Sequence, residues 1–160
     1  MHNQWLDESS RNHHYTASIH TFLRKHVAGL DMAPGAAAWS SVVVRPYAAL
    51  PLPADLEAAV PFARATTDSY RGTVEVSWAR KIGNGGGVQL NATLPSGTEG
   101  AVSVPKTFGN TTSCTEGSSV VWRGGAFVPG VPGVLAAVDD GSFIVFTVTS
   151  GAFVFASIAA

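Results

Sequence analysis

Histidines are concentrated near the start of the chain, and imidazole is the commonest side-chain ligand for metals. The four that could form a cluster are His13, His14, His20 and His26. A zinc-protease helix carries two histidines four residues apart with a glutamate beside them, and no pair in this set has that arrangement. His20 and His26 are six residues apart and would lie on different sides of a helix. The pattern predicts neither a metal site nor a cofactor.

Carboxylates are the second group that could do chemistry, because a glycosidase needs two of them on opposite sides of a sugar ring. Asp7 and Glu8 are adjacent in the sequence and cannot flank a substrate by themselves. Beyond Asp31, the carboxylates are expected in turns or on solvent-facing surfaces: Glu57, Asp68, Glu75, Glu99, Glu116, Asp139 and Asp140. The chain alone is therefore not expected to assemble a catalytic pair.

Composition limits the classes of function. Only 13% of the 160 residues are charged while 46% are hydrophobic, which indicates one packed domain rather than disorder. The net charge of -1 gives no electrostatic footprint for nucleic acid or an anionic membrane. No run approaches the roughly 18 apolar residues that a membrane helix needs. The single cysteine, Cys114, has no partner for an internal disulfide and is expected to be a structural thiol.

Signals for localisation are weak. The first eight residues have neither the basic stretch nor the apolar core of a signal peptide, so none is predicted. Asn91-Ala92-Thr93 and Asn110-Thr111-Thr112 both fit the glycosylation acceptor pattern. Without a secretion signal these triplets carry little weight, and the compartment is left open.

A helix over about residues 15–28 is the first element that would position the N-terminal polar groups. Its apolar stripe consists of Ile19, Phe22, Leu23, Val27 and Leu30. Asn12 or Ser10 can cap its start, and Gly29 can supply the left-handed residue that ends it. From Asp31 onward the helical periodicity disappears.

The rest of the chain reads as short strands separated by Gly, Pro and Asp turns. Val74, Val76 and Trp78 alternate with polar residues, as in a half-buried antiparallel strand. The run 142–148 is apolar on both faces and should be central or covered on both sides. The predicted strands are 39–45, 62–68, 73–80, 88–94, 100–104, 120–122, 133–138, 142–148 and 152–157, with a possible helical turn at 55–59. The predicted fold is mainly β, an antiparallel two-sheet β-sandwich preceded by one N-terminal α-helix.

The stretch from Asn12-His13-His14-Tyr15 to Val27-Ala28-Gly29-Leu30 resembles the end of the helical barrel of bacterial and fungal α-L-rhamnosidases. In that family an Asn-His pair precedes a helix that ends in Ala-Gly-Ile or Ala-Gly-Leu. Further segments resemble its C-terminal β-sandwich: Pro34-Gly35, Trp39, Val42 to Pro46, Thr73 to Arg80 and Leu94 to Thr98. The resemblance implies that residues 1–30 are the end of the catalytic barrel and residues 31–160 the accessory sandwich.

The resemblance also implies roles for two residues. His13 would line the rhamnose pocket and hydrogen-bond the sugar, while Asn12 would hold the loop; a capping or packing role is the alternative for His13. The family's general base lies in a Trp-Glu-x-Trp stretch upstream. If Trp5 were a remnant of it, the acidic position would be Asn3, and the spacing to His13 is too short. No catalytic residue is therefore assigned.

Two functions follow as hypotheses. The first is the C-terminal part of an α-L-rhamnosidase-like glycoside hydrolase, inactive alone. Its partners would be a rhamnose-containing carbohydrate and a missing N-terminal catalytic barrel, with no nucleic acid or membrane. The second is a free-standing carbohydrate-binding or scaffold sandwich, in which Trp39, Trp78 and Trp122 could stack on sugars, although the alternation favours a core position for Trp78. A truncated product with no function of its own is a third, blander possibility.

Overall fold

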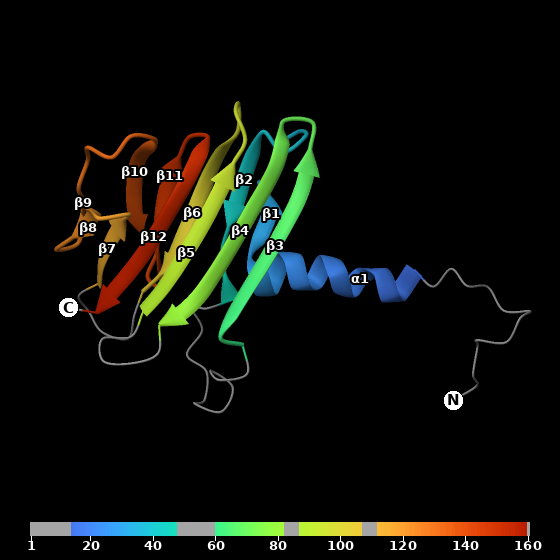
Figure 1. The fold of residues 1–160 in the computed structure, drawn as a ribbon, viewed down its shortest axis with the longest axis horizontal. Helices are drawn as coiled ribbons and strands as arrows, with labels where there is room; N and C mark the ends of the chain where they lie inside the picture. Colours follow the sequence, from blue (N-terminus) through green and yellow to red (C-terminus); the bar gives the residue numbers. More distant parts are fainter. Residues whose placement is uncertain (1–13, 48–59, 82–86, 107–111, 160) are drawn as a thin grey trace, which may run out of the picture.

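Two β-sheets packed face to face make up most of the molecule, with one helix at their edge (Figure 1). The computed structural model describes residues 14–47, 60–81, 87–106, 112–159. The predicted mainly-β sandwich with an N-terminal helix is confirmed. The predicted helical turn at 55–59 lies outside the described residues.

The helix has two parts. α1 covers His14–Phe22 and continues into a π-helical segment, η1, over Leu23–Ala28. The predicted end is confirmed, since Gly29 has a left-handed φ of 82° and donates its N–H to the Arg24 carbonyl. The sequence predicted a single α-helix, but its last six residues are π-helical. This wider segment is the part of the helix that contacts the sandwich.

The larger sheet has seven strands in the order β3-β4-β5-β12-β7-β8-β9, and all its pairs are antiparallel. Its four longest strands lie side by side at the front of Figure 1. The bounds are β3 Phe62–Ser69, β4 Gly72–Lys81, β5 Gly87–Leu94, β12 Gly151–Ala159, β7 Thr112–Glu116, β8 Ser119–Arg123 and β9 Ala126–Phe127.

The smaller sheet has five strands in the order β1-β2-β6-β11-β10. The bounds are β1 Leu30–Met32, β2 Ser41–Val44, β6 Glu99–Pro105, β11 Phe143–Val148 and β10 Val134–Asp139. β2 and β6 pair in parallel, with Val42 opposite Gly100, so this sheet is not wholly antiparallel as predicted. The long connection between β2 and β6 allows this pairing because it passes through three strands of the other sheet.

The core lies between the inner faces of the two sheets. The predicted alternation is confirmed, since Val74, Val76 and Trp78 of β4 are all buried. Phe146 of the smaller sheet stacks on Phe155 of the larger one, with ring centroids 4.7 Å apart. This contact joins the two layers within the core.

Several strand bounds differ from the predictions for identifiable reasons. The strand predicted at 39–45 is β2, and it begins at Ser41 rather than Trp39. Ala38 and Trp39 have positive φ values of 51° and 60° and form a turn. β1, β7 and β9 were not predicted. β11 is an inner strand as expected, but it is covered on both faces only in its first half, since Thr147 is exposed.

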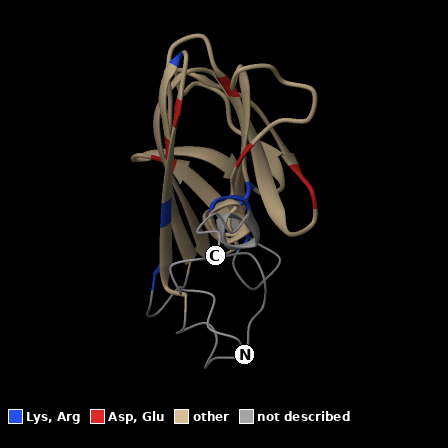
Figure 2. Ribbon diagram, turned by 90° about the vertical axis from the view of Figure 1, so that its right-hand side faces the viewer, with Lys and Arg blue, Asp and Glu red and all other residues tan. Residues whose placement is uncertain are grey.

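Charged residues of both signs are visible on the side of the molecule that carries the helix. Figure 2, seen from the helix end, shows basic residues on the helix and on parts of the sandwich, and acidic residues on several elements of the sandwich. Among the described residues, no helix has the length and apolar content required to span a membrane.

Candidate functional site

The helix is held against the sandwich by side chains from the helix itself, from β4 and from the turn before β2. The Trp78 indole N–H donates to the Val27 carbonyl at 3.1 Å, and an Arg24 guanidinium N–H donates to the Leu30 carbonyl at 3.0 Å. The same guanidinium lies 5.2 Å from the centre of the Trp39 ring, within cation–π range. These contacts fix the helix direction relative to both sheets.

An ion pair at the end of the helix adds to this attachment. Lys25 Nζ lies 2.9 Å from a carboxylate oxygen of Asp31, the middle residue of β1. Burial tends to raise the pKa of Asp31, but the hydrogen bonds from Lys25 and the Met32 N–H, with the charges of Lys25 and Arg24, lower it overall. The carboxylate therefore stays ionised, which keeps the pair intact at neutral pH.

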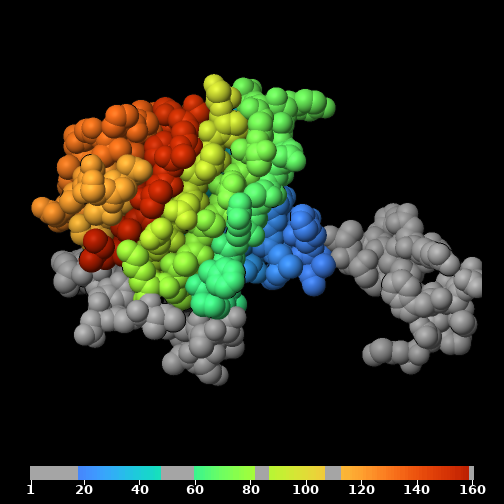
Figure 3. Space-filling view, viewed as in Figure 1, coloured from blue at the N-terminus to red at the C-terminus, as the bar shows by residue number. Residues whose placement is uncertain are grey.

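The opposite side of the helix carries large apolar groups in water. Ile19, Phe22 and Leu23 are 62%, 56% and 50% exposed, and their spacing puts them on one face. We call these three residues the helix face. In Figure 3 the helix, in blue, projects beyond the sandwich at the edge formed by β3. The sequence predicted the stripe to which they belong as the apolar side of an amphipathic helix, and these three members of it are not covered by the described part of the chain.

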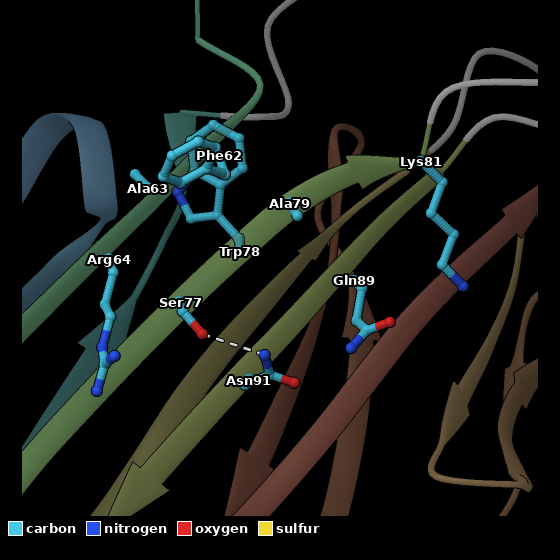
Figure 4. A pocket seen from close by; sticks show the side chains of 9 residues that line it. All are labelled: Phe62, Ala63, Arg64, Ser77, Trp78, Ala79, Lys81, Gln89 and Asn91. Carbon is cyan, nitrogen blue, oxygen red and sulfur yellow. Dashed lines mark hydrogen bonds between the residues drawn. The ribbon is translucent and has the colours of Figure 1, made fainter.

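A hollow lies on the outer face of the larger sheet, over β3, β4 and β5 (Figure 4). Its volume is about 410 Å³. We call it the outer-face hollow, and its lining residues are Phe62, Ala63, Arg64, Ser77, Trp78, Ala79, Lys81, Gln89 and Asn91. Gln89 and Asn91 alternate with Val88, Leu90 and Ala92 in the sequence, but no site was predicted there. Ala79 lies between the larger Phe62 and Gln89 of the two neighbouring strands, and no single segment of the sequence shows this.

Four of the described carboxylates form ion pairs with basic side chains, and one of them is the Asp31–Lys25 pair given above. Asp139 pairs with Lys106, Asp140 with Arg45 and Glu75 with Arg64. Within the ranges that the structure describes, no three or more His, Cys, Asp and Glu side chains gather as metal ligands would. The paired carboxylates therefore neutralise basic side chains of the sandwich.

Comparison with known families decides what this sandwich is. The family model for the bacterial alpha-L-rhamnosidase C-terminal domain matches residues 29–119, more than half of the chain. The chain belongs to this family. No curated protein matches it.

Two solved structures resemble the rhamnosidase domain over nearly its whole length. The α-L-rhamnosidase from Dictyoglumus thermophilum matches 96% of the chain with a TM-score of 0.71 at 18% identity, a likeness of fold. The α-L-rhamnosidase from Streptomyces avermitilis, in complex with L-rhamnose, matches 91% with a TM-score of 0.59 at 29% identity. The chain spans only 15% and 11% of those two proteins.

The two residues that the resemblance assigns to the sugar pocket of this rhamnosidase domain, His13 and Asn12, lie outside the described residues. The structure describes the helix that follows them, beginning at His14. The roles of His13 and Asn12 therefore remain predictions.

Of the two glycosylation sequons, the one at Asn110 also lies outside the described ranges. Asn91 of the other lies within β5, is half-buried, and donates to Ser77 Oγ at 3.1 Å.

The three tryptophans considered as sugar platforms are not equally available. Trp78 and Trp122 are buried, at 1% and 5% exposure. Trp78 therefore has the core position that its alternation favoured, whereas the expectation of stacking on a sugar is wrong for Trp122. Trp39 is half-buried and has Arg24 over its ring.

Cys114 is fully buried, and burial raises its pKa to about 12, so it stays a protonated thiol in the core.

Proposed function

We propose that this domain is the C-terminal part of a longer α-L-rhamnosidase, which as a whole hydrolyses terminal α-L-rhamnosides. Membership of the family supports this proposal, as does the small share of the two similar enzymes that the chain spans. The observation that carries it is the helix face, because a firmly attached helix exposes large apolar side chains that another part of the enzyme would cover.

The helix face fits the role of a docking surface for the catalytic barrel. Ile19, Phe22 and Leu23 are each at least half exposed, and covering the rest of such a side chain gains roughly 1 kcal/mol. A helix tethered by Trp78, Arg24 and Lys25 would present that face in one orientation. The sandwich would therefore be placed firmly against the barrel rather than joined to it by a mobile link.

The chain alone is expected to lack activity. The family resemblance places the general acid and base in the upstream barrel, and without them proton transfer and water activation are lost. Glu75, Asp139 and Asp140 of the sandwich are already held in ion pairs. The purified chain should release no rhamnose from an aryl α-L-rhamnoside above the uncatalysed rate. An enzyme-like rate from the chain alone would refute this part of the proposal.

Assembly with the upstream part is the direct test of docking. Coding sequence upstream of Met1 should specify a helical barrel with paired carboxylates, and that barrel should associate with the chain. The double variant F22Q/L23Q should weaken the association by at least about tenfold, because two apolar contacts are lost. Y70Q is the matched control, since Tyr70 is a fully exposed aromatic at the turn between β3 and β4. Equal loss in both variants, or an upstream region without a barrel, would contradict the proposal.

Within that enzyme, we retain the roles that the family resemblance implies for His13 and Asn12. His13 would hydrogen-bond the rhamnose, so H13A should raise KM for the aryl rhamnoside about tenfold with the melting temperature unchanged. H14A at the neighbouring position is the control. A fall in melting temperature without a change in KM would instead assign His13 to helix capping or packing.

A further inference from the structure

We propose that the outer-face hollow is a second carbohydrate site, and that it binds a sugar carrying a carboxylate, a uronate. The site would be formed by β3, β4 and β5 alone. It requires neither the helix face nor a catalytic barrel, and it is therefore independent of the function proposed above.

The register of the strands explains the shape of the hollow. Phe62, Ala79 and Gln89 lie opposite one another across β3, β4 and β5, and Arg64, Ser77 and Asn91 form the adjoining row. Residues two apart on a strand share a face, so both rows point outward. Ala79 is the smallest of these side chains and leaves a floor between the larger Phe62 and Gln89. Figure 4 shows the polar groups of the two rows around this floor.

The lining has the groups that recognise a sugar. The amides of Gln89 and Asn91 and the hydroxyl of Ser77 combine donors and acceptors, as the hydroxyls of a saccharide require. Asn91 uses one amide hydrogen on Ser77 Oγ, which fixes its orientation and leaves the other hydrogen and the carbonyl oxygen for a ligand. Phe62 is 68% exposed at the edge of the hollow, and its ring offers an apolar surface for the C–H face of a sugar.

The charges in the hollow favour an anionic sugar over a neutral one. Arg64 is paired with Glu75, so its positive charge is balanced. The Lys81 ammonium lines the hollow and has no ion-pair or hydrogen-bond partner within the ranges that the structure describes. One unbalanced cation beside neutral donors and acceptors matches a single carboxylate on a polyhydroxyl ring.

A titration followed by amide NMR tests the proposal. D-glucuronate and L-rhamnose are added separately to the ¹⁵N-labelled 160-residue chain in low-salt buffer. D-glucuronate should shift the side-chain amide signals of Gln89 and Asn91 and bind at least about threefold more tightly than L-rhamnose. The difference should shrink in about 1 M salt, where screening acts over roughly 3 Å.

Variants separate the charge from the hydrogen bonds. K81M should remove the preference for D-glucuronate while K81R keeps it, and Q89A should weaken binding of both sugars by about fivefold. T66A is the control, because Thr66 is exposed on β3 outside the hollow. Equal affinity for the two sugars, no shifts in β3, β4 and β5, or shifts confined to the helix would each overturn the proposal. The spectra of the variants also report whether each remains folded.

Discussion

At the scale of single residues, Gly29 joins the helix to the sandwich. Its φ of 82° lies in the left-handed region, and a Cβ there would come within 2.3 Å of the Arg45 carbonyl group. The Arg45 N–H also donates to the Gly29 carbonyl at 2.7 Å, so the two backbones cannot separate without losing a hydrogen bond. We expect G29A to lower the free energy of unfolding by about 2 to 5 kcal/mol, measured by urea denaturation.

Gly35 provides the matched control for that prediction. Its φ of 77° is nearly the same, but nothing lies within 4 Å of the position that a Cβ would occupy. G35A should therefore cost only the conformational penalty of about 1 to 2 kcal/mol. If both variants lose the same stability, the close approach to Arg45 has no energetic weight.

Also at the residue scale, Asp139 makes stability depend on pH. The hydrogen bond from Lys106 and the Gly141 N–H lower its pKa below the usual value. A carboxyl whose pKa is lower in the folded state stabilises the fold above the unfolded pKa, and this contribution is lost as the pH falls through the folded pKa. The free energy of unfolding should therefore decrease below about pH 4. K106M should make that decrease shallower in urea titrations between pH 2 and 6, whereas K81M should leave it unchanged.

At the scale of elements, the strands that the sequence predicted best are those with one apolar and one polar face. The predicted bounds of β4 and β5 differ from the observed ones by at most one residue, because in each strand every second side chain is apolar and buried. The buried sets are Val74, Val76 and Trp78 in β4 and Leu90, Ala92 and Leu94 in β5. β7 was missed because its sequence, Thr-Ser-Cys-Thr-Glu, has little apolar alternation and is held by pairing with β8 and β12. The parallel pairing of β2 with β6 depends on residues far along the chain, which no local pattern encodes.

The helix is the element whose attachment can be tested separately from its formation. W78F removes the indole N–H that donates to the Val27 carbonyl while keeping an aromatic ring in the core. It should cost about 1 to 3 kcal/mol and speed amide hydrogen exchange in residues 23–28 beyond the change in global stability. W122F, which changes another buried tryptophan, should leave the relative protection of those amides unchanged. Equal exchange in the two variants would mean that the indole hydrogen bond does not hold the helix.

At the scale of the whole molecule, the sequence predicted the two-layer fold but not the candidate sites on it. The outer-face hollow requires Phe62, Ala79 and Gln89 from three strands to meet, and the register between strands is not visible in any one segment. Which residues of the apolar stripe stay exposed depends on how the helix packs against the sandwich, and only the structure shows this. The predicted roles of His13 and Asn12 came from family resemblance, and neither side chain lies in the described part of the chain.

The stability of the whole sandwich should depend on the contact between its layers rather than on its outer surfaces. Phe146 is fully buried and stacks on Phe155 of the opposite sheet, so F146A leaves a cavity between the layers. It should lower the free energy of unfolding by about 3 to 5 kcal/mol. F62A makes the same chemical change on the outer face, where the ring is 68% exposed, and should cost less than about 1 kcal/mol. Urea denaturation of both variants measures the difference. A loss for F62A as large as that for F146A would show that the outer face contributes as much to folding as the core, and the hollow would then have to be regarded as a structural feature.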